Sequence, residues 1–150
     1  MQSGLYYGEM SDFKKNLIHQ ISDLFPEETK KFLKTEGKKQ LKIQKQVAKQ
    51  KVGTKHNDDK SYHKKFNVTK VFEGEDKSKG IKVYNSSPHA HLIEYGHYQV
   101  PRGKKGSSNK GGISNGWTNG KHVIETAQTM FKEEYYKDCD EFLGTFFDKL

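Results

Sequence analysis

Three histidines and a glutamate fall within the stretch SSPHAHLIEYGH at positions 86–97. Imidazole nitrogens and carboxylate oxygens are ordinary ligands of zinc and nickel, and the same groups serve in general acid–base catalysis. The spacing argues against a tight metal site, because His89 and His91 share a face on a strand but lie about 200° apart on a helix. We therefore expect no bound metal and no cofactor at His89, His91, Glu94 and His97.

Catalysis by the same stretch would need further groups. It offers a histidine and a glutamate, but no nucleophile or second carboxylate stands with them, and exposed polar loop residues account for the composition. A second candidate, GSSNKGGI at 106–113, has Gly112 and Ile113 where a phosphate-binding loop needs lysine and a hydroxyl group. We expect no catalytic residue and no nucleotide site, and hence a protein that is not an enzyme.

The order of residues in the first stretch indicates a structural role. Leu92 and Ile93 have the character of core residues, and Glu94, Tyr95 and Gly96 follow them directly. Glycine adopts positive backbone φ values that are costly for other residues, so Gly96 is expected to end the segment and to start the loop after it. We expect Glu94 and Gly96 to serve structure rather than chemistry.

Hydrophobic spacing predicts helices at both ends of the chain. Residues 1–52 are predicted to be helical in two segments, with Pro26 ending the first helix and opening the second. Residues 121–150 are predicted to form one long helix. The supporting apolar stripes are Phe13, Leu17, Ile21 and Leu24, then Phe32, Leu33, Leu41, Ile43, Val47 and Ala48, and finally Val123, Ala127, Met130, Phe131, Tyr135, Phe142 and Phe146.

The middle of the chain, residues 62–100, is expected to hold strands and the motif. FNVTKVF and IKVYN alternate in polarity around the turn-forming EGEDKSKG, which predicts an antiparallel hairpin over 66–85. Residues 101–120 contain six glycines and are expected to be a mobile loop without regular structure. The predicted fold class is α+β: a single domain over 1–150, in which the N-terminal helices and a long C-terminal helix pack on an antiparallel sheet.

The net charge of +8 comes almost wholly from lysine, with Arg102 as the only arginine. Lysine gives a diffuse positive field and lacks the rigid fork with which arginine reads bases, so sequence-specific DNA recognition is not expected. Non-specific attraction to nucleic acid stays open beside a merely solvated lysine surface. Only 31% of the residues are hydrophobic, which predicts a thin core and favours an oligomer.

Cysteine usage and hydropathy bear on the compartment. Cys139 is the only cysteine, which excludes a disulfide within one chain and a zinc finger. The sequence has no run of roughly 18 apolar residues and no basic and apolar leader at its start. We expect a protein that is made in the cytoplasm and has no membrane partner.

The stretch VYNSSPHAHLIEYGHYQVPRG, followed after the glycine-rich loop by GKHVIETAQTMFKEEY, resembles the tail-component family of long-tailed bacteriophages, the tail completion or head-tail joining proteins. The family pattern is a strand ending in Asn, an apolar segment reaching Leu-(Leu/Ile/Val)-Glu-(Phe/Tyr)-Gly-(His/Thr), a loop, and a short His-containing stretch before the last helix. The similarity covers roughly residues 62–135. The residues that fall on the pattern are Asn85, Leu92, Ile93, Glu94, Tyr95, Gly96, His97, His122, Ile124 and Ala127.

The resemblance implies a structural virion protein of the phage neck, which joins tail to head as a ring around the DNA channel and is made in the host bacterial cytoplasm. It implies a hexamer, neighbouring neck and tail proteins as partners, and DNA that passes without sequence-specific contacts. The rival classes are a non-specific nucleic-acid-binding basic protein and a metal-dependent enzyme. The glycine-rich loop supplies the candidate partner contacts, Arg102, Lys104, Lys105, Lys110 and Trp117, although Trp117 folded back on its own subunit is an open alternative.

Overall fold

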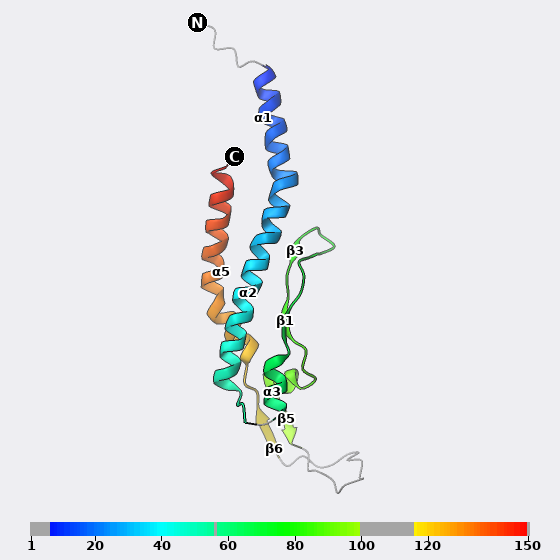
Figure 1. Ribbon diagram of the computed structural model, residues 1–150, viewed down its shortest axis with the longest axis vertical. Helices are drawn as coiled ribbons and strands as arrows, with labels where there is room; N and C mark the ends of the chain where they lie inside the picture. Colours follow the sequence, from blue (N-terminus) through cyan, green and yellow to red (C-terminus); the bar gives the residue numbers. More distant parts are fainter. Residues whose placement is uncertain (1–6, 56, 100–115, 150) are drawn as a thin grey trace. The chain divides into compact units, whose positions relative to one another are not determined.

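The computed structural model describes residues 7–55, 57–99 and 116–149 (Figure 1). Helices occupy both ends of this chain, and short strands lie between them. In chain order the elements are α1 (Tyr7–His19), the π-helical turn η1 (Gln20–Leu24), α2 (Phe25–Lys51), α3 (Asn57–Lys64), β1 (Phe66–Val68), β2 (Phe72–Glu73), β3 (Lys79–Gly80), β4 (Val83–Asn85), α4 (Ala90–Tyr95), β5 (Gly96–Gln99), β6 (Gly116–Asn119) and α5 (Val123–Phe147). The α+β class is confirmed.

The strands pair differently from the single sheet that the sequence predicts. The hairpin over 66–85 is confirmed: β1 pairs antiparallel with β4, and β2 pairs antiparallel with β3. A further antiparallel pair joins β5 to β6. Among the described residues each sheet has two strands, and each strand is only two to four residues long.

Pro26 does not end the first helix, which corrects the prediction made from the sequence. The chain stays helical through η1, and the backbone N–H of Phe25 donates to the carbonyl oxygen of Gln20, five residues earlier. Proline lacks an N–H, and its ring clashes with the carbonyl group four residues before it in a regular α-helix. The wider π turn directly before Pro26 removes this conflict, so the helix continues instead of breaking.

Contacts divide the chain into two compact units, each described by itself. The first unit takes residues up to 39, 69–82 and those from 132 onward, and the second takes 40–68 and 83–131. Helices α2 and α5 contribute to both. The single domain that chain length suggests stays a prediction.

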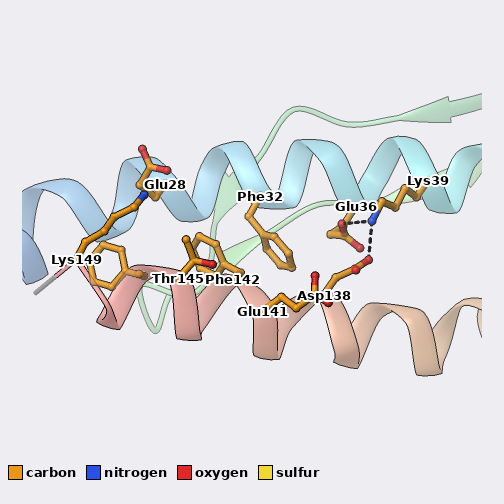
Figure 2. A pocket seen from close by; sticks show the side chains of 10 residues that line it. Glu28, Phe32, Glu36, Lys39, Asp138, Glu141, Phe142, Thr145 and Lys149 are labelled. Atoms are coloured by element: carbon orange, nitrogen blue, oxygen red, sulfur yellow. Dashed lines mark hydrogen bonds and ion pairs between the residues drawn. The ribbon is translucent and has the colours of Figure 1, made fainter.

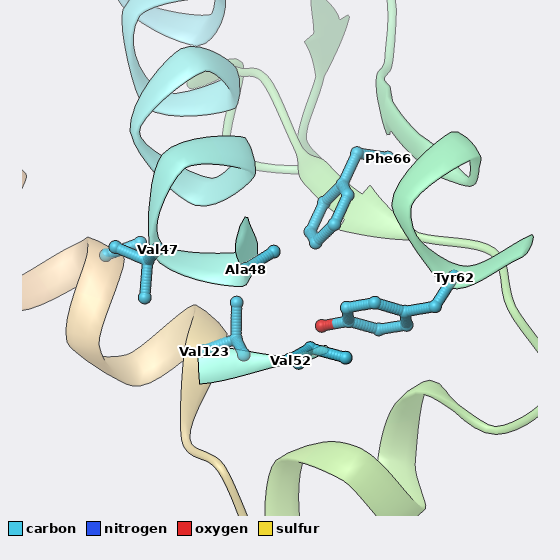
Figure 3. Packing of buried hydrophobic residues seen from close by; sticks show 7 residues of the cluster. Val47, Ala48, Val52, Tyr62, Phe66 and Val123 are labelled. Atoms are coloured by element: carbon cyan, nitrogen blue, oxygen red, sulfur yellow. The ribbon is translucent and has the colours of Figure 1, made fainter. Parts of the chain in front are cut away.

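The second unit holds a small hydrophobic core (Figure 3). Its buried members come from α2 and the residue directly after it, the first turns of α5, α3 and β1: Val47, Ala48, Val52, Tyr62, Phe66, Val123 and Ala127. The start of α5 therefore packs mainly against helices, and β1 offers only Phe66 to this cluster. Phe66 of β1 lies in the same buried cluster as Val123 and Ala127 of α5.

In the first unit α2 and α5 run antiparallel and meet through aromatic rings. Phe25 contacts Phe146 edge to face at 4.8 Å between ring centroids, and Phe32 stacks on Phe142 at 4.7 Å. Farther along the same pair, the Lys39 ammonium group donates to Asp138 Oδ2 at 2.5 Å. Since Phe25 opens α2 and Phe146 lies one residue before the end of α5, α5 ends near the first turn of α2.

A buried carboxylate lies beside this ion pair (Figure 2). Glu36 Oε1 is 3.1 Å from Lys39 Nζ, whereas Glu36 Oε2 is buried without a hydrogen-bond partner. Burial raises the pKa of the Glu36 carboxyl group, and the hydrogen bond from Lys39 lowers the pKa of Asp138. Asp138 is therefore the better partner of Lys39, and burial opposes the charged form of Glu36.

Replacing Glu36 by methionine tests this effect of burial. A raised carboxyl pKa in the folded state means that wild-type stability falls as pH rises from the ordinary value of 4.5 through the raised pKa. The Glu36→Met variant lacks this fall. The difference between its free energy of unfolding and that of wild type should therefore increase over that pH window, and at neutral pH the variant should be more stable by about 1 kcal/mol. Urea denaturation at several pH values measures the difference. Thr35→Met, an exposed neighbour, is the control, and a pH-independent difference for Glu36→Met would contradict the assignment.

Candidate functional site

The carboxylate of Glu94 caps the N-terminus of α5. Glu94 lies in the short helix α4 and is only 5% exposed. Its Oε2 accepts a hydrogen bond from the backbone N–H of Ile124 at 2.9 Å, and its Oε1 accepts one from the N–H of Glu125 at 3.0 Å. The first N–H groups of a helix have no partner within the helix and carry partial positive charge, so a buried carboxylate satisfies them and is itself stabilised.

Backbone hydrogen bonds hold the segment before α5 against α4. The N–H of Lys121 donates to the carbonyl oxygen of Ile93 at 2.6 Å, and the N–H of His122 donates to that of Glu94 at 3.2 Å. Glu94 therefore binds the start of α5 through both its backbone and its side chain. Burial, together with the nearby carboxylate of Glu94, raises the pKa of Tyr62 to about 12.

His122 occupies the position directly before α5 in an unusual backbone conformation. Its φ of 48° lies in the left-handed region, where a non-glycine residue is uncommon. Its carbonyl oxygen accepts from the N–H of Thr126 at 3.1 Å, which is the first bond of the helix, and its Nδ1 is 2.8 Å from Glu125 Oε2. His122 thus acts as the residue at which the chain turns into α5.

Gly96 has the positive φ that the sequence predicts, with φ 86° and ψ 174°. A Cβ atom here would lie 2.4 Å from the carbonyl oxygen of Thr118 and 2.8 Å from the backbone N of Gly120. At Gly120 a Cβ would in turn lie 2.3 Å from the carbonyl oxygen of Glu94. Two backbones cross in contact at this point, and both positions exclude side chains.

The chain beyond Gly96 is a strand, not the start of an irregular loop. Gly96 pairs with Asn119, and Tyr98 pairs with Trp117, so residues 116–119 form regular structure that the sequence prediction denied them. The rings of Tyr98 and Trp117 meet edge to face at 4.9 Å. An aromatic cross-strand pair and the β-branched Thr118 favour pairing, and they outweigh the flanking glycines on which the prediction relied.

The other residues of the motif are placed as structural supports. Asn85 donates from Nδ2 to the carbonyl oxygen of Tyr62 at 2.9 Å, and its Oδ1 accepts from the N–H of Ser87 at 2.8 Å. Ile93 packs against the hydrophobic core, and the carbonyl oxygen of Leu92 accepts from the N–H that closes α4 at Gly96. Together with Glu94, these residues fasten α4 to its surroundings.

Tyr95 and His97 differ from those supports. Tyr95 is 71% exposed, so it does not pack in the core. The Nδ1 atom of His97 is buried without a hydrogen-bond partner.

Metal ligands, membrane-spanning helices and the predicted partner contacts remain to be placed. Within the described residues no group of three or more His, Cys, Asp or Glu side chains could hold a metal ion, and none of their helices is long and apolar enough to cross a membrane. Trp117 is half exposed and packs on Tyr98 of its own chain. Arg102, Lys104, Lys105 and Lys110 lie outside the described residues.

Another possible site is a cleft of about 330 Å³ between α2 and α5 in the first unit (Figure 2). Its charged side chains include Glu28, Glu36, Lys39, Asp138 and Glu141. Lys39, its central cation, already pairs with Glu36 and Asp138, so the cleft leaves that charge largely satisfied. The sequence gives no signal for this pairing, because 99 residues separate Lys39 from Asp138.

No family model, no curated protein sequence and no solved structure matches this chain. The resemblance to phage tail components therefore rests on the motif residues alone.

Removing the cap should cost stability without disturbing any exposed surface. Glu94→Ala leaves the N–H groups of Ile124 and Glu125 without a partner, so the free energy of unfolding should fall by about 2–3 kcal/mol. Glu94→Gln keeps one accepting oxygen and should cost about half as much. Chemical denaturation measures both. Glu125→Ala removes only the exposed contact with His122 and should change stability by less than about 0.5 kcal/mol, and a loss at Glu94 no larger than this would contradict the capping role.

A methyl group at Gly96 should be far more damaging than one on an open helix surface. Gly96→Ala must accommodate both a positive φ and a backbone contact at 2.4 Å, so we expect a loss of about 3 kcal/mol or failure to fold. Gly144→Ala is the matched control: it lies within α5 with nothing within 4 Å of its Cβ position, and it should gain about 0.5–1 kcal/mol. Thermal unfolding followed by circular dichroism compares the two, and equal melting temperatures would refute the close crossing.

Proposed function

We propose that this protein is a structural component of the phage virion, a tail completion or head-tail joining protein that forms a ring around the DNA channel in the neck. The observation that carries the proposal is the double cap of Glu94 on α5. Most of the residues of the family pattern converge on this one architectural junction, and their contacts are structural rather than catalytic. A motif of this kind suits a subunit whose task is to hold shape within an assembly.

The junction also presents a surface suited to a partner. Gly96, at the crossing, begins strand β5, and β5 and β6 carry the aromatic pair Tyr98 and Trp117. These rings are 68% and 50% exposed. Large exposed aromatic side chains on a braced hairpin are typical anchors of protein interfaces. We assign this pair to contact with a neighbouring neck or tail protein.

The charge of the chain fits passage of DNA without reading of its sequence. Nine lysines lie between Lys30 and Lys51 along α2, whereas arginine is confined to one position of the chain. Ammonium groups attract phosphates without geometric selection among bases. A ring lined by such a field would tolerate moving DNA of any sequence, and base-specific contacts would oppose the movement.

A genetic experiment tests the proposal. A stop codon early in the gene, in the phage or prophage that encodes the chain, should give DNA-filled heads and unattached tails by electron microscopy, with infectivity restored by wild-type protein from a plasmid. Gly144→Ala should restore it equally, and Glu94→Ala should restore it poorly. Mass spectrometry should find the chain in purified virions. Normal infectivity without the protein, or its absence from virions, would refute the proposal.

The rival of a non-specific nucleic-acid-binding protein makes a different prediction for purified protein. Its affinity for duplex DNA would be high at low salt and would fall steeply on a plot of log affinity against log salt concentration, with a slope set by the number of phosphates contacted. Fluorescence anisotropy measures this slope. Tight, salt-dependent binding together with absence from virions would favour the rival.

A further inference from the structure

The N-terminal helix extends beyond the helix that partners it in its own chain. Residues 7–24, formed by α1 and η1 and called here the overhanging helix, span 18 residues. Because the last turn of α5 meets the first turn of α2 through Phe25 and Phe146, the antiparallel partner ends where the overhanging helix begins. Its side chains from Ser11 to Leu24 are all exposed or half-exposed.

An exposed helix of this composition needs a partner. Phe13 is 62% exposed and Ile21 is 55% exposed, and with Leu17 and Leu24 they recur at the spacing that places them on one face. In water an isolated helix of this length is marginal, because nucleation is costly and most helix stability in proteins comes from packing of the apolar face. The sequence thus encodes a packing face that its own described chain does not cover.

A second apolar stripe lies on the outer side of α5. Tyr136, Leu143 and Phe147, called here the outward stripe, follow one another at spacings of seven and four, roughly 100° around the helix from Phe142 and Phe146. Tyr136 is 58% exposed and Phe147 is 60% exposed. Helix α5 therefore has two adjacent apolar faces, one packed on α2 and the other left exposed by the described residues.

Charge favours one pairing between the two stripes. Helix α5 carries six acidic residues against two lysines, whereas in α1 two lysines balance two acidic residues and Lys14 lies beside the apolar face. If the helices run antiparallel with Leu17 against Leu143, their equal rise per residue sets Phe13 at Phe147.

The same register pairs charges as well as apolar residues. It sets Leu24 at Tyr136, which completes the apolar seam, and brings Asp23, whose Oδ2 lies 2.8 Å from His19 Nδ1 of its own helix, to Lys137. Asp23 is 63% exposed, and Lys137 is exposed on its helix. Asp23 and Lys137 therefore meet as opposite charges at the edge of an apolar seam, an arrangement that helps to fix partner and orientation between helices.

We infer that the overhanging helix of one copy packs on the outward stripe of α5 in a second copy. The two surfaces differ, so the contact is head to tail and repeats from copy to copy, which closes into a ring when the rotation permits. The inference deepens the proposed function and rests on it for the closed ring. The contact itself is tested with purified protein, so its failure is distinguishable from a failure of the virion test.

Mixed cross-linking tests the contact directly. In a Cys139→Ser background, a tagged chain with Leu17→Cys and an untagged chain with Leu143→Cys are mixed and oxidised, and the disulfide-linked species are separated without reductant. We expect a linked tagged–untagged pair, and far less of it when Tyr84→Cys, an exposed hairpin position, replaces Leu143→Cys. No mixed species, or equal yield with Tyr84→Cys, overturns the inference.

A variant with both cysteines on one chain distinguishes contact between copies from folding back within one copy. With Leu17→Cys and Leu143→Cys on the same chain, bonds between copies should predominate. If dilution leaves only internally bonded monomers, the overhanging helix folds onto its own α5 and the inference is wrong.

Association measurements provide the second readout. Sedimentation of the full wild-type chain should show concentration-dependent oligomers. Leu143→Asp should raise the dissociation constant at least ~30-fold, since it places a charge in the apolar seam, while Tyr84→Ser should change it less than about 2-fold. Circular dichroism checks that each variant keeps its helix content, and a wild-type chain that stays monomeric overturns the inference.

A charge exchange checks the orientation. Asp23→Lys and Lys137→Asp should each weaken association, and the two changes together on every chain should restore most of it. Failure of the double variant to recover, with both single variants weakened, rules out the antiparallel register with Leu17 at Leu143.

Discussion

The carboxylate of Glu94 on the N-terminus of α5 is the contact on which the second unit depends. It joins the two halves of that unit across 30 residues of sequence, since α4 precedes the glycine-rich region and α5 follows it. The core contains Val123 and Ala127 from the first turns of α5, so the position of that helix decides whether the cluster closes. The interaction of a buried anion with a helix N-terminus is strong because the N–H donors are fixed in place and water is excluded.

Several features around this contact follow from it. The chain must reach α5 close beside α4, which brings the backbones of 94–96 and 118–120 into direct contact and leaves room for glycine alone at Gly96 and Gly120. It must also turn sharply into the helix, and His122 accepts a left-handed conformation to do so. Strain at one residue and the loss of two side chains are the local costs of a rigid junction.

The sequence predicts those elements whose signal is local. The period of the apolar residues locates the terminal helices, alternation locates the 66–85 hairpin, and the position of Gly96 after an apolar segment predicts its positive φ. Strand β6 escapes prediction because glycines flank it and its pairing depends on Tyr98 in a distant segment. The capping of α5 by Glu94 could not be predicted from the sequence either. The partners of Glu94 are backbone N–H groups, which every residue except proline has, so no residue type marks them. Gly120, two residues before His122, was the available hint of a close crossing.

The π turn η1 adds a constraint on length. Because such a turn takes in an extra residue, it winds the following helix back by about one residue's rotation, ~100°, relative to an uninterrupted α-helix. On helical geometry this brings Phe25 and Phe32 toward the side of the helix that carries Leu17 and Leu24. The segment 20–24 therefore works as a phase spacer between two packing faces. Its residues can vary while the phase is kept, but an insertion or deletion of one residue would turn the face of α1 out of line with that of α2.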